Sequence, residues 1–260
     1  MKRNLKIFLL FSKYALKSTL QHPVGSFFFL IGKLLRFCTY FLFVSYLLSK
    51  TKFLAGYSQT ETLIFYLTFT IIDTTSQLLF REVYRFRPLV INGELDTILI
   101  KPYHPFLRIL VGGVDLLDLF TILIYIVMLI HYILLLPTLI APNFFIFLLL
   151  SINGLVIATA FHIIVLALGI LTTEVDHTIM IYRDLSRVAV MPIDIYKEPL
   201  RTFLTFVIPI GIMSTFPVKS LLGILSWQMI VVSFFVSLVL MTCALTLWDK
   251  ALKKYQSWGG

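Results

Sequence analysis

The amino-acid sequence predicts an all-α integral membrane protein, and both its composition and its hydrophobic pattern lead to this class. Of the 260 residues, 59% are hydrophobic and 13% are charged, and the mean hydropathy is +0.94. Soluble domains average about 45–50% apolar and about 25% charged residues, so this chain has more apolar side chains than a soluble core could bury. Its apolar runs are continuous, whereas transmembrane strands alternate over about ten residues. At about 20 residues per span, the length predicts six transmembrane helices in a single domain, 1–260.

The first element is the segment 1–24, in which apolar residues at helical spacing lie opposite a basic face. We expect a retained interfacial helix, because its apolar stretch is too short for a signal peptide and is followed by lysines. Spans are then predicted at 25–48, 62–80, 109–135, 144–171, 203–216 and 224–248. In the fifth span, Pro209, Gly211 and Pro217 lie close together, which predicts a broken helix or a re-entrant hairpin.

Lysine and arginine are distributed unevenly between the two sides of this topology. With the N-terminus inside, the inner segments 1–24, 81–108, 172–202 and 249–260 hold seventeen of the 22 basic residues, and the outer loops hold three. Because basic residues are retained on the cytoplasmic side, both termini are expected in the cytoplasm. The net charge of +9 is then a signature of orientation, and no nucleic-acid partner is expected.

A polar stretch, INGELDTILIKPYHP, interrupts the apolar pattern within the segment 81–108. Pro88 and Gly93 are expected to turn the chain, and ELDTILI to form a short helix with Glu94 and Asp96 near the positive end of its dipole. From the residues alone, this stretch is either a docking element for a cytoplasmic partner or the solvated face of an ordinary loop. Acid–base catalysis is not favoured, because carboxylates two positions apart diverge on a helix.

Two stretches resemble the permease subunits of type-two ABC exporters, and are closest to the small six-span branch that includes viologen- and drug-exporter-like systems. The first, RFRPLVINGELDTILIKPYHPFLRIL, matches through Arg87, Pro88, Gly93, Glu94, Leu95, Asp96, Lys101 and Pro102. The second, MPIDIYKEPLRTFLTFVIPIGIMSTFPVKSLL, matches through Pro192, Ile195, Tyr196, Arg201, Ile208, Pro209 and Pro217. Met191 departs from the family pattern, in which an aromatic residue often precedes the first of these prolines.

The resemblance implies a permease in a prokaryotic inner membrane that forms the translocation path as a dimer, with the same or a homologous chain. It implies that residues 91–105 are a coupling helix seated in a separate cytoplasmic ATPase. The residues implied in coupling are Arg85, Arg87, Pro88, Gly93, Glu94, Leu95, Asp96, Lys101 and Pro102. ATP and Mg²⁺ would bind to that ATPase, since this sequence has no Gly-x4-Gly-Lys-Ser/Thr loop to cradle phosphates. No catalytic residue, metal or cofactor is expected in the chain itself, and membrane lipids are its other partners.

Polar residues inside the spans are candidates for the translocation path. Asp73 is costly in a membrane unless it faces protein or water, so it is either a substrate or cation contact or an interhelical partner. Gln77 follows on the same span, and Asn153, His162 and Pro209 complete the candidates. A single interhelical hydrogen bond explains Asn153 and His162 more simply than a ligand does.

Charged residues near the inner ends of two spans have simpler interpretations. Lys33 and Arg36 lie one helical turn apart, and either reach the inner headgroups or form a basic patch toward a cavity or an anionic lipid. Asp115 and Asp118 are expected to pair with arginine or lysine.

The substrate is not specified by the sequence. An aromatic content of 15% is compatible with an amphipathic or flat cationic compound, or a lipid, as the substrate. It is equally compatible with ordinary packing between helices. The alternative classes are a secondary transporter or channel that needs no ATPase, and a membrane enzyme. The long inner segments and the two family stretches favour the exporter permease.

Overall fold

The computed structural model describes residues 2–51, 53–172 and 175–256, and in these ranges the chain is helical and forms no strand. Five helices of the described part are long and apolar enough to cross a membrane: α2 (Pro23–Thr51), α3 (Gln59–Leu79), α6 (Leu116–Leu134), α7 (Ala141–Thr172) and α11 (Trp227–Lys254). A sixth candidate is a pair of helices bent by 94°. The all-α membrane fold is therefore confirmed.

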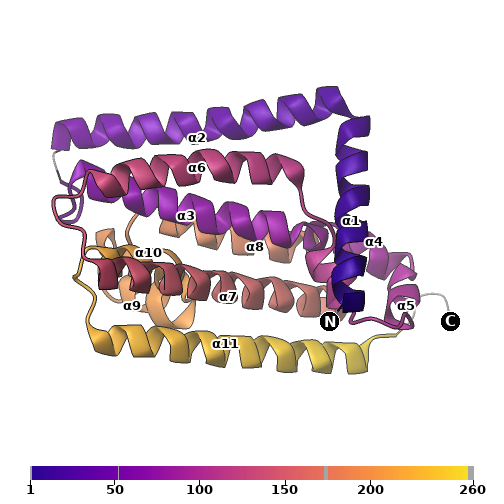
Figure 1. Ribbon diagram of the computed structural model, residues 1–260. Helices are drawn as coiled ribbons and strands as arrows, with labels where there is room; N and C mark the ends of the chain where they lie inside the picture. Colours follow the sequence, from indigo (N-terminus) through magenta and orange to yellow (C-terminus); the bar gives the residue numbers. More distant parts are fainter. Residues whose placement is uncertain (1, 52, 173–174, 257–260) are drawn as a thin grey trace.

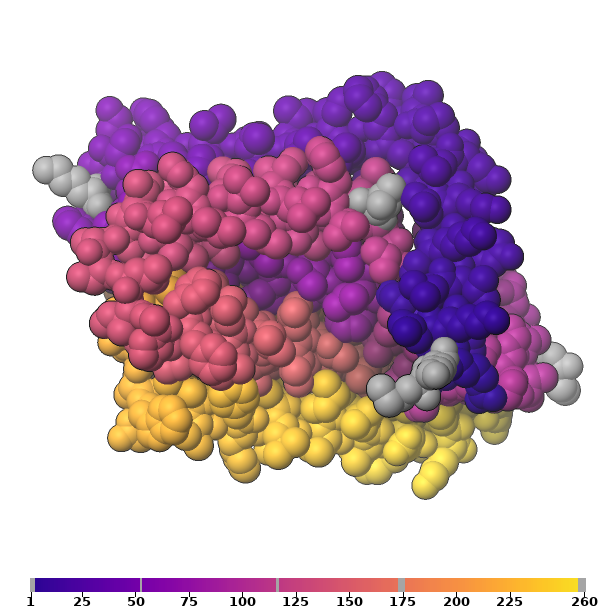
Figure 2. All heavy atoms as spheres, viewed as in Figure 1, coloured from indigo at the N-terminus to yellow at the C-terminus, as the bar shows by residue number. Residues whose placement is uncertain are grey.

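The long helices lie side by side, so the bundle has two distinct ends (Figure 1). The near end holds both termini, α1 (Lys2–Gln21), α4 (Phe86–Ile91) and α5 (Glu94–Leu99). The far end holds the α2–α3 and α6–α7 connections. Figure 2 shows α1 lying across the near end, transverse to α2. This is the orientation expected of a helix in the membrane surface.

Helix α7 is the centre of the bundle and packs most extensively against α11 and α10 (Ile210–Leu221). It is buried along most of its length, and Leu150, Ile157 and Leu166 have no exposed surface. Gly154 allows α10 to approach, because a Cβ at this position would overlap the carbonyl oxygen of Met213. Such close contact at a small residue is typical of helix packing in membranes.

The third span starts later than predicted. Leu107–Val111 form a short π-helical turn, η2, and the chain breaks at Gly112 before α6 begins. Gly112 has φ 54°, and a Cβ there would overlap the side chain of the buried Glu82. Asp115 then caps α6, since its carboxylate accepts a hydrogen bond from the Leu117 amide at 2.9 Å.

The segment 172–202 differs from the expectation that it stays on the inner side. Helix α8 (Val175–Arg187) starts at the near end and runs back along α7 (Figure 1). Asp194 lies at the far end, because its carboxylate accepts a hydrogen bond from the Tyr57 hydroxyl at 2.9 Å. Residues 175–193 therefore run from the near end of the bundle to the far end. Hydropathy does not detect this run, because α8 carries charged residues.

The predicted fifth span is a broken helix, as expected. Leu200–Val207, comprising α9 (Leu200–Thr202) and the π-helical turn η5 (Phe203–Val207), meets α10 at a bend beside Pro209. Lys219 near the end of α10 pairs at 2.7 Å with Asp194, which precedes α9. Because the hairpin enters and leaves at the far end, it is re-entrant and does not cross the bundle.

Candidate functional site

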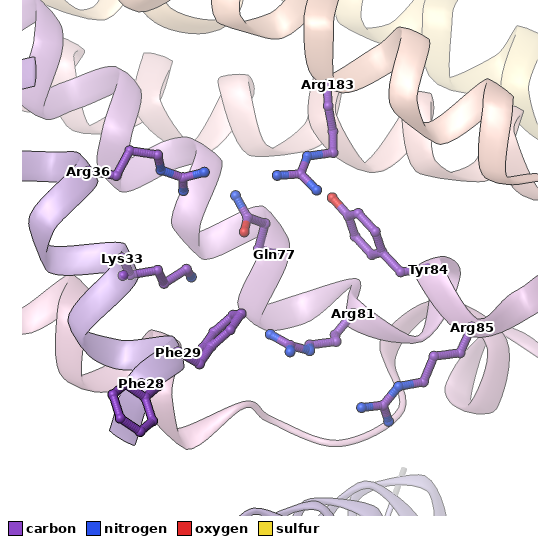
Figure 3. Close-up of a pocket in the computed structure, with 10 residues that line it drawn as sticks. Phe28, Phe29, Lys33, Arg36, Gln77, Arg81, Tyr84, Arg85 and Arg183 are labelled. Atoms are coloured by element: carbon purple, nitrogen blue, oxygen red, sulfur yellow. The ribbon is translucent and has the colours of Figure 1, made fainter. Parts of the chain in front are cut away.

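Basic side chains from three parts of the chain meet in a cavity toward the near end of the bundle (Figure 3). The cavity has a volume of about 440 Å³, and its polar lining consists of Lys33, Arg36, Gln77, Arg81, Tyr84, Arg85 and Arg183. The contributing elements are α2, α3, the 3₁₀ helix η1 (Arg81–Arg85) and α8. In Figure 3, Lys33 and Arg36 point toward the same space as Arg81 and Arg183 on the opposite wall.

A second cavity of about 260 Å³ shares Lys33, Arg36 and Arg183 with the first. Its lining contains the five aromatic residues Phe37, Tyr40, Tyr66, Phe69 and Tyr125, together with polar and charged side chains. The ring of Phe37 lies 5.5 Å from that of Tyr66 and 4.4 Å from that of Tyr125, between centroids. A basic cavity is thus joined to an aromatic one.

Carboxylates neutralise part of the basic charge. Lys33 pairs with the buried Asp118, and Arg81 pairs with Asp115 at 2.5 Å, so the predicted pairing of both aspartates is confirmed. The Lys33 side chain is only 9% exposed, so it faces the protein and does not extend to the headgroups. Arg36 and Arg183 form no ion pair with any carboxylate in the described part of the chain.

Tyr84 gives the basic cavity a neutral hydrogen-bond donor. Burial raises the pKa of Tyr84 to about 12, although the nearby Arg183 acts in the opposite direction. The Arg183 guanidinium lies 5.7 Å from the centre of the Tyr84 ring, a cation–π contact. The hydroxyl therefore stays protonated at physiological pH.

The structure separates the five predicted path residues into two groups. Gln77 lines the basic cavity and donates a hydrogen bond at 2.7 Å to Asp73, which lines the aromatic cavity. Asn153 is buried and donates to the Ser233 carbonyl oxygen at 3.3 Å, which joins α7 to α11. His162 and Pro209 are also buried. These last three line neither of the two cavities described here.

Arg183 and Arg187 are cavity residues that the sequence reasoning did not single out. They lie four positions apart, on one face of an amphipathic helix. The four-residue spacing of the two arginines indicates a shared helix face, but the segment that contains them was predicted to be an inner loop.

At the near end, α5 presents two different faces. It begins after Gly93, which has φ 71°, and covers the stretch where a short helix was predicted. Leu95 and Ile98 are 0% and 4% exposed and pack in a cluster with residues of α7 and α11. The other face leaves Glu94 exposed, and Ile100 beyond the helix is 84% exposed.

Several implied coupling residues have partners within the chain. Arg85 pairs at 3.2 Å with Glu82, which also pairs with Arg108, and Arg87 pairs at 3.4 Å with Asp176. Glu82 therefore clamps η1 to η2, a role that the sequence reasoning missed.

Pro88 does not turn the chain as expected. It occupies the first turn of α4, where backbone N–H groups have no intrahelical acceptor.

The two acidic residues of α5 also differ from each other. Burial, followed by the neighbouring Asp96 carboxylate, raises the pKa of Tyr255 to about 12. Asp96 is thus turned toward its own C-terminal segment, whereas Glu94 is open to a partner. The exposed Lys101 and Pro102 follow, and the Pro102 carbonyl oxygen accepts a hydrogen bond from Arg3 of α1.

A bundle of membrane-crossing helices around a charged internal cavity defines a membrane transport protein, since intramembrane charges line substrate or ion pathways. A protein-family model described as an ABC-2 family transporter protein matches residues 34–259. The chain therefore belongs to the ABC-2 transporter family and is a multi-pass permease of an ABC transporter. Comparisons with curated proteins and with solved structures gave no match.

Proposed function

We propose that the chain is the transmembrane subunit of an ATP-driven exporter, coupled through α5 to a separate cytoplasmic ATPase. The observation that best supports this proposal is that α5 has one buried face and one exposed face. On its apolar side, Leu95 and Ile98 belong to the buried cluster that includes residues of α7 and α11, and α5 packs on α4, which packs on α7. Glu94 and Ile100 remain exposed. A force applied to the exposed face would therefore pass through α4 and the buried cluster to α7 rather than be absorbed by a flexible loop.

The near end is the cytoplasmic side in this proposal. Its segments 2–21, 81–108 and 249–256 carry thirteen lysines and arginines. Among the described residues, the far end carries Lys50, Lys197, Arg201 and Lys219. The basic excess supports this orientation, in a prokaryotic inner membrane, even after part of 172–202 is moved to the far end.

A second permease, identical or homologous, would complete the path. Arg187 and Asp184 pair at 3.0 Å on α8, and their side chains are 57% and 68% exposed. We infer that α8 makes the fifth crossing, because residues 175–193 run from the near end to the far end. Charges at this depth are costly against lipid, so a partner chain or a water-filled path must cover them. A dimer in which the two permeases contact each other along α8 would supply the partner chain and enclose the water-filled path.

ATP and Mg²⁺ bind to the ATPase in this proposal, and this chain contributes no catalytic residue. The test is purification of the tagged chain from native membranes, with ATP hydrolysis measured before and after removal of co-purified proteins. We expect hydrolysis only in the complex. ATP hydrolysis by the isolated chain would contradict the proposal, and transport by the isolated chain without ATP would favour a secondary transporter or channel.

A further inference from the structure

The charges around the two cavities do not balance. Among the described residues, the two linings contain six basic side chains, Lys33, Arg36, Arg81, Arg85, Arg183 and Arg187, and one carboxylate, that of Asp73. Four of the basic side chains have ion-pair partners: Lys33, Arg81, Arg85 and Arg187. Arg36 and Arg183 have no ion-pair partner, and both interact electrostatically with the one remaining carboxylate, that of Asp73, which accepts a hydrogen bond from Gln77. The site is therefore positive even with every neighbouring acid ionised.

The unpaired guanidinium groups surround a space rather than line a surface. In Figure 3, Arg36 extends from α2 and Arg183 from α8 toward each other, with Gln77 between them. The ends of Lys33 and Arg81 point into the same space. Planar guanidinium groups bind carboxylate, sulfonate or phosphate oxygens through two parallel hydrogen bonds. Because unpaired charges inside a membrane protein are costly, a bound anion would stabilise this arrangement.

The adjoining aromatic cavity provides room for an apolar group. Its rings include Tyr40 and Tyr66, stacked with centroids 5.1 Å apart, and a flat or alkyl body can pack against them. The two cavities share Lys33, Arg36 and Arg183, so one molecule can place its charged head among the basic groups and its body among the rings.

We propose that this pair of cavities binds an amphipathic anion, a carboxylate, sulfonate or phosphate attached to an apolar body. The inference rests on the proposed exporter function and names the substrate class of its path. It replaces the flat cationic compound that the aromatic content alone suited, because a cation would meet two guanidinium groups, those of Arg36 and Arg183, that face the single carboxylate of Asp73. The same head chemistry is available from an anionic lipid or from a soluble amphipathic anion.

The test uses the full chain in phosphatidylcholine nanodiscs, with empty nanodiscs as the blank. The probes are 1-pyrenesulfonate and 1-pyrenemethylammonium, which share a ring system and differ in the sign of charge, and binding is followed by fluorescence anisotropy. We expect the sulfonate to bind at least about 10-fold more tightly. Arg36→Gln and Arg183→Gln should each weaken its binding about 10-fold, and Arg36→Lys should retain part of the affinity.

Arg201→Gln is the matched control, because Arg201 is an exposed arginine at the far end that pairs with Glu198 and lines neither cavity. Its sulfonate affinity should equal that of the wild type. Two competitors identify the source of the anionic head group. Displacement of the probe by phosphatidylglycerol added to the nanodiscs indicates a lipid ligand. Displacement by soluble hexanesulfonate, and not by phosphatidylglycerol, indicates a soluble ligand.

Equal or tighter binding of the ammonium probe would overturn the inference. So would wild-type sulfonate affinity in both Arg→Gln variants, once thermal unfolding has shown that they are folded. Either result would leave ATPase capture through α5 unchanged. Failure of this inference is therefore distinguishable from failure of the exporter proposal, which is tested by the ATPase and not by the probe.

Discussion

Charge reversal on the exposed face of α5 tests the coupling mechanism most directly. Glu94 is exposed, whereas Leu95 beside it is fully buried and Asp96 is turned toward Tyr255. Glu94→Lys therefore changes the face offered to an ATPase without removing any packing. Asp96→Lys would change the contact with the C-terminal segment as well, so it cannot report on the ATPase alone.

The expected magnitude follows from this difference in burial. Loss of one partner of a desolvated charge pair at an interface costs about 2–5 kcal/mol, which is about 30-fold to several thousand-fold in affinity. In the free permease, Glu94→Lys should change stability by less than about 0.5 kcal/mol, as surface substitutions usually do. Leu95→Ala should instead cost about 2–5 kcal/mol of stability, because it leaves a cavity where α5 packs on the bundle.

The assay is a pull-down of the ATPase by tagged permease, combined with thermal unfolding of the permease in detergent. Glu198→Lys is the matched control, since Glu198 is an exposed glutamate at the far end, paired with Arg201. We expect Glu94→Lys to lose the ATPase and keep its melting temperature, and Glu198→Lys to keep both. ATPase retained by Glu94→Lys at the wild-type level, together with intact transport, would refute the coupling role of this face.

Three further predictions concern the fold and the cavity. Gly112→Ala should lower stability in thermal unfolding by about 1–3 kcal/mol, because its Cβ overlaps a buried glutamate at positive φ. Gly25→Ala should leave stability unchanged, because Gly25 has open space around it. Equal melting temperatures of Gly112→Ala and the wild type would refute the requirement for a glycine at the break before α6. Cysteine at Lys197 should react with an impermeant maleimide from outside the cell, and cysteine at Glu94 only from inside; inside-only labelling at Lys197 would refute the crossing by α8. Asp73→Asn should tighten 1-pyrenesulfonate binding about 3- to 10-fold, because it removes the carboxylate from the cavity wall. Weaker binding would show that Asp73 assists the anion.

The sequence by itself determined the features that depend on neighbouring residues along the chain. Five apolar runs are long enough to cross a membrane wherever they pack, and Pro209 breaks the helix because it lacks a backbone N–H. Gly93 takes a positive φ that most other residues adopt only with strain, so α5 begins where the turn was predicted. The family stretches are likewise continuous pieces of sequence.

Only the tertiary structure decided which charges meet. Hydropathy averages the cost of each residue separately, so it assigns a helix with several charged residues to a loop. The structure instead packs α8 along α7, from the near end toward the far end. Arg36 and Arg183 are far apart in sequence, and no local pattern relates them, yet α2 and α8 bring them to one cavity. The same holds for Asp96, whose neighbour Tyr255 lies at the other end of the chain. Charge compensation is a property of pairs in space, and for that reason the fold, and not the sequence pattern, determined the site.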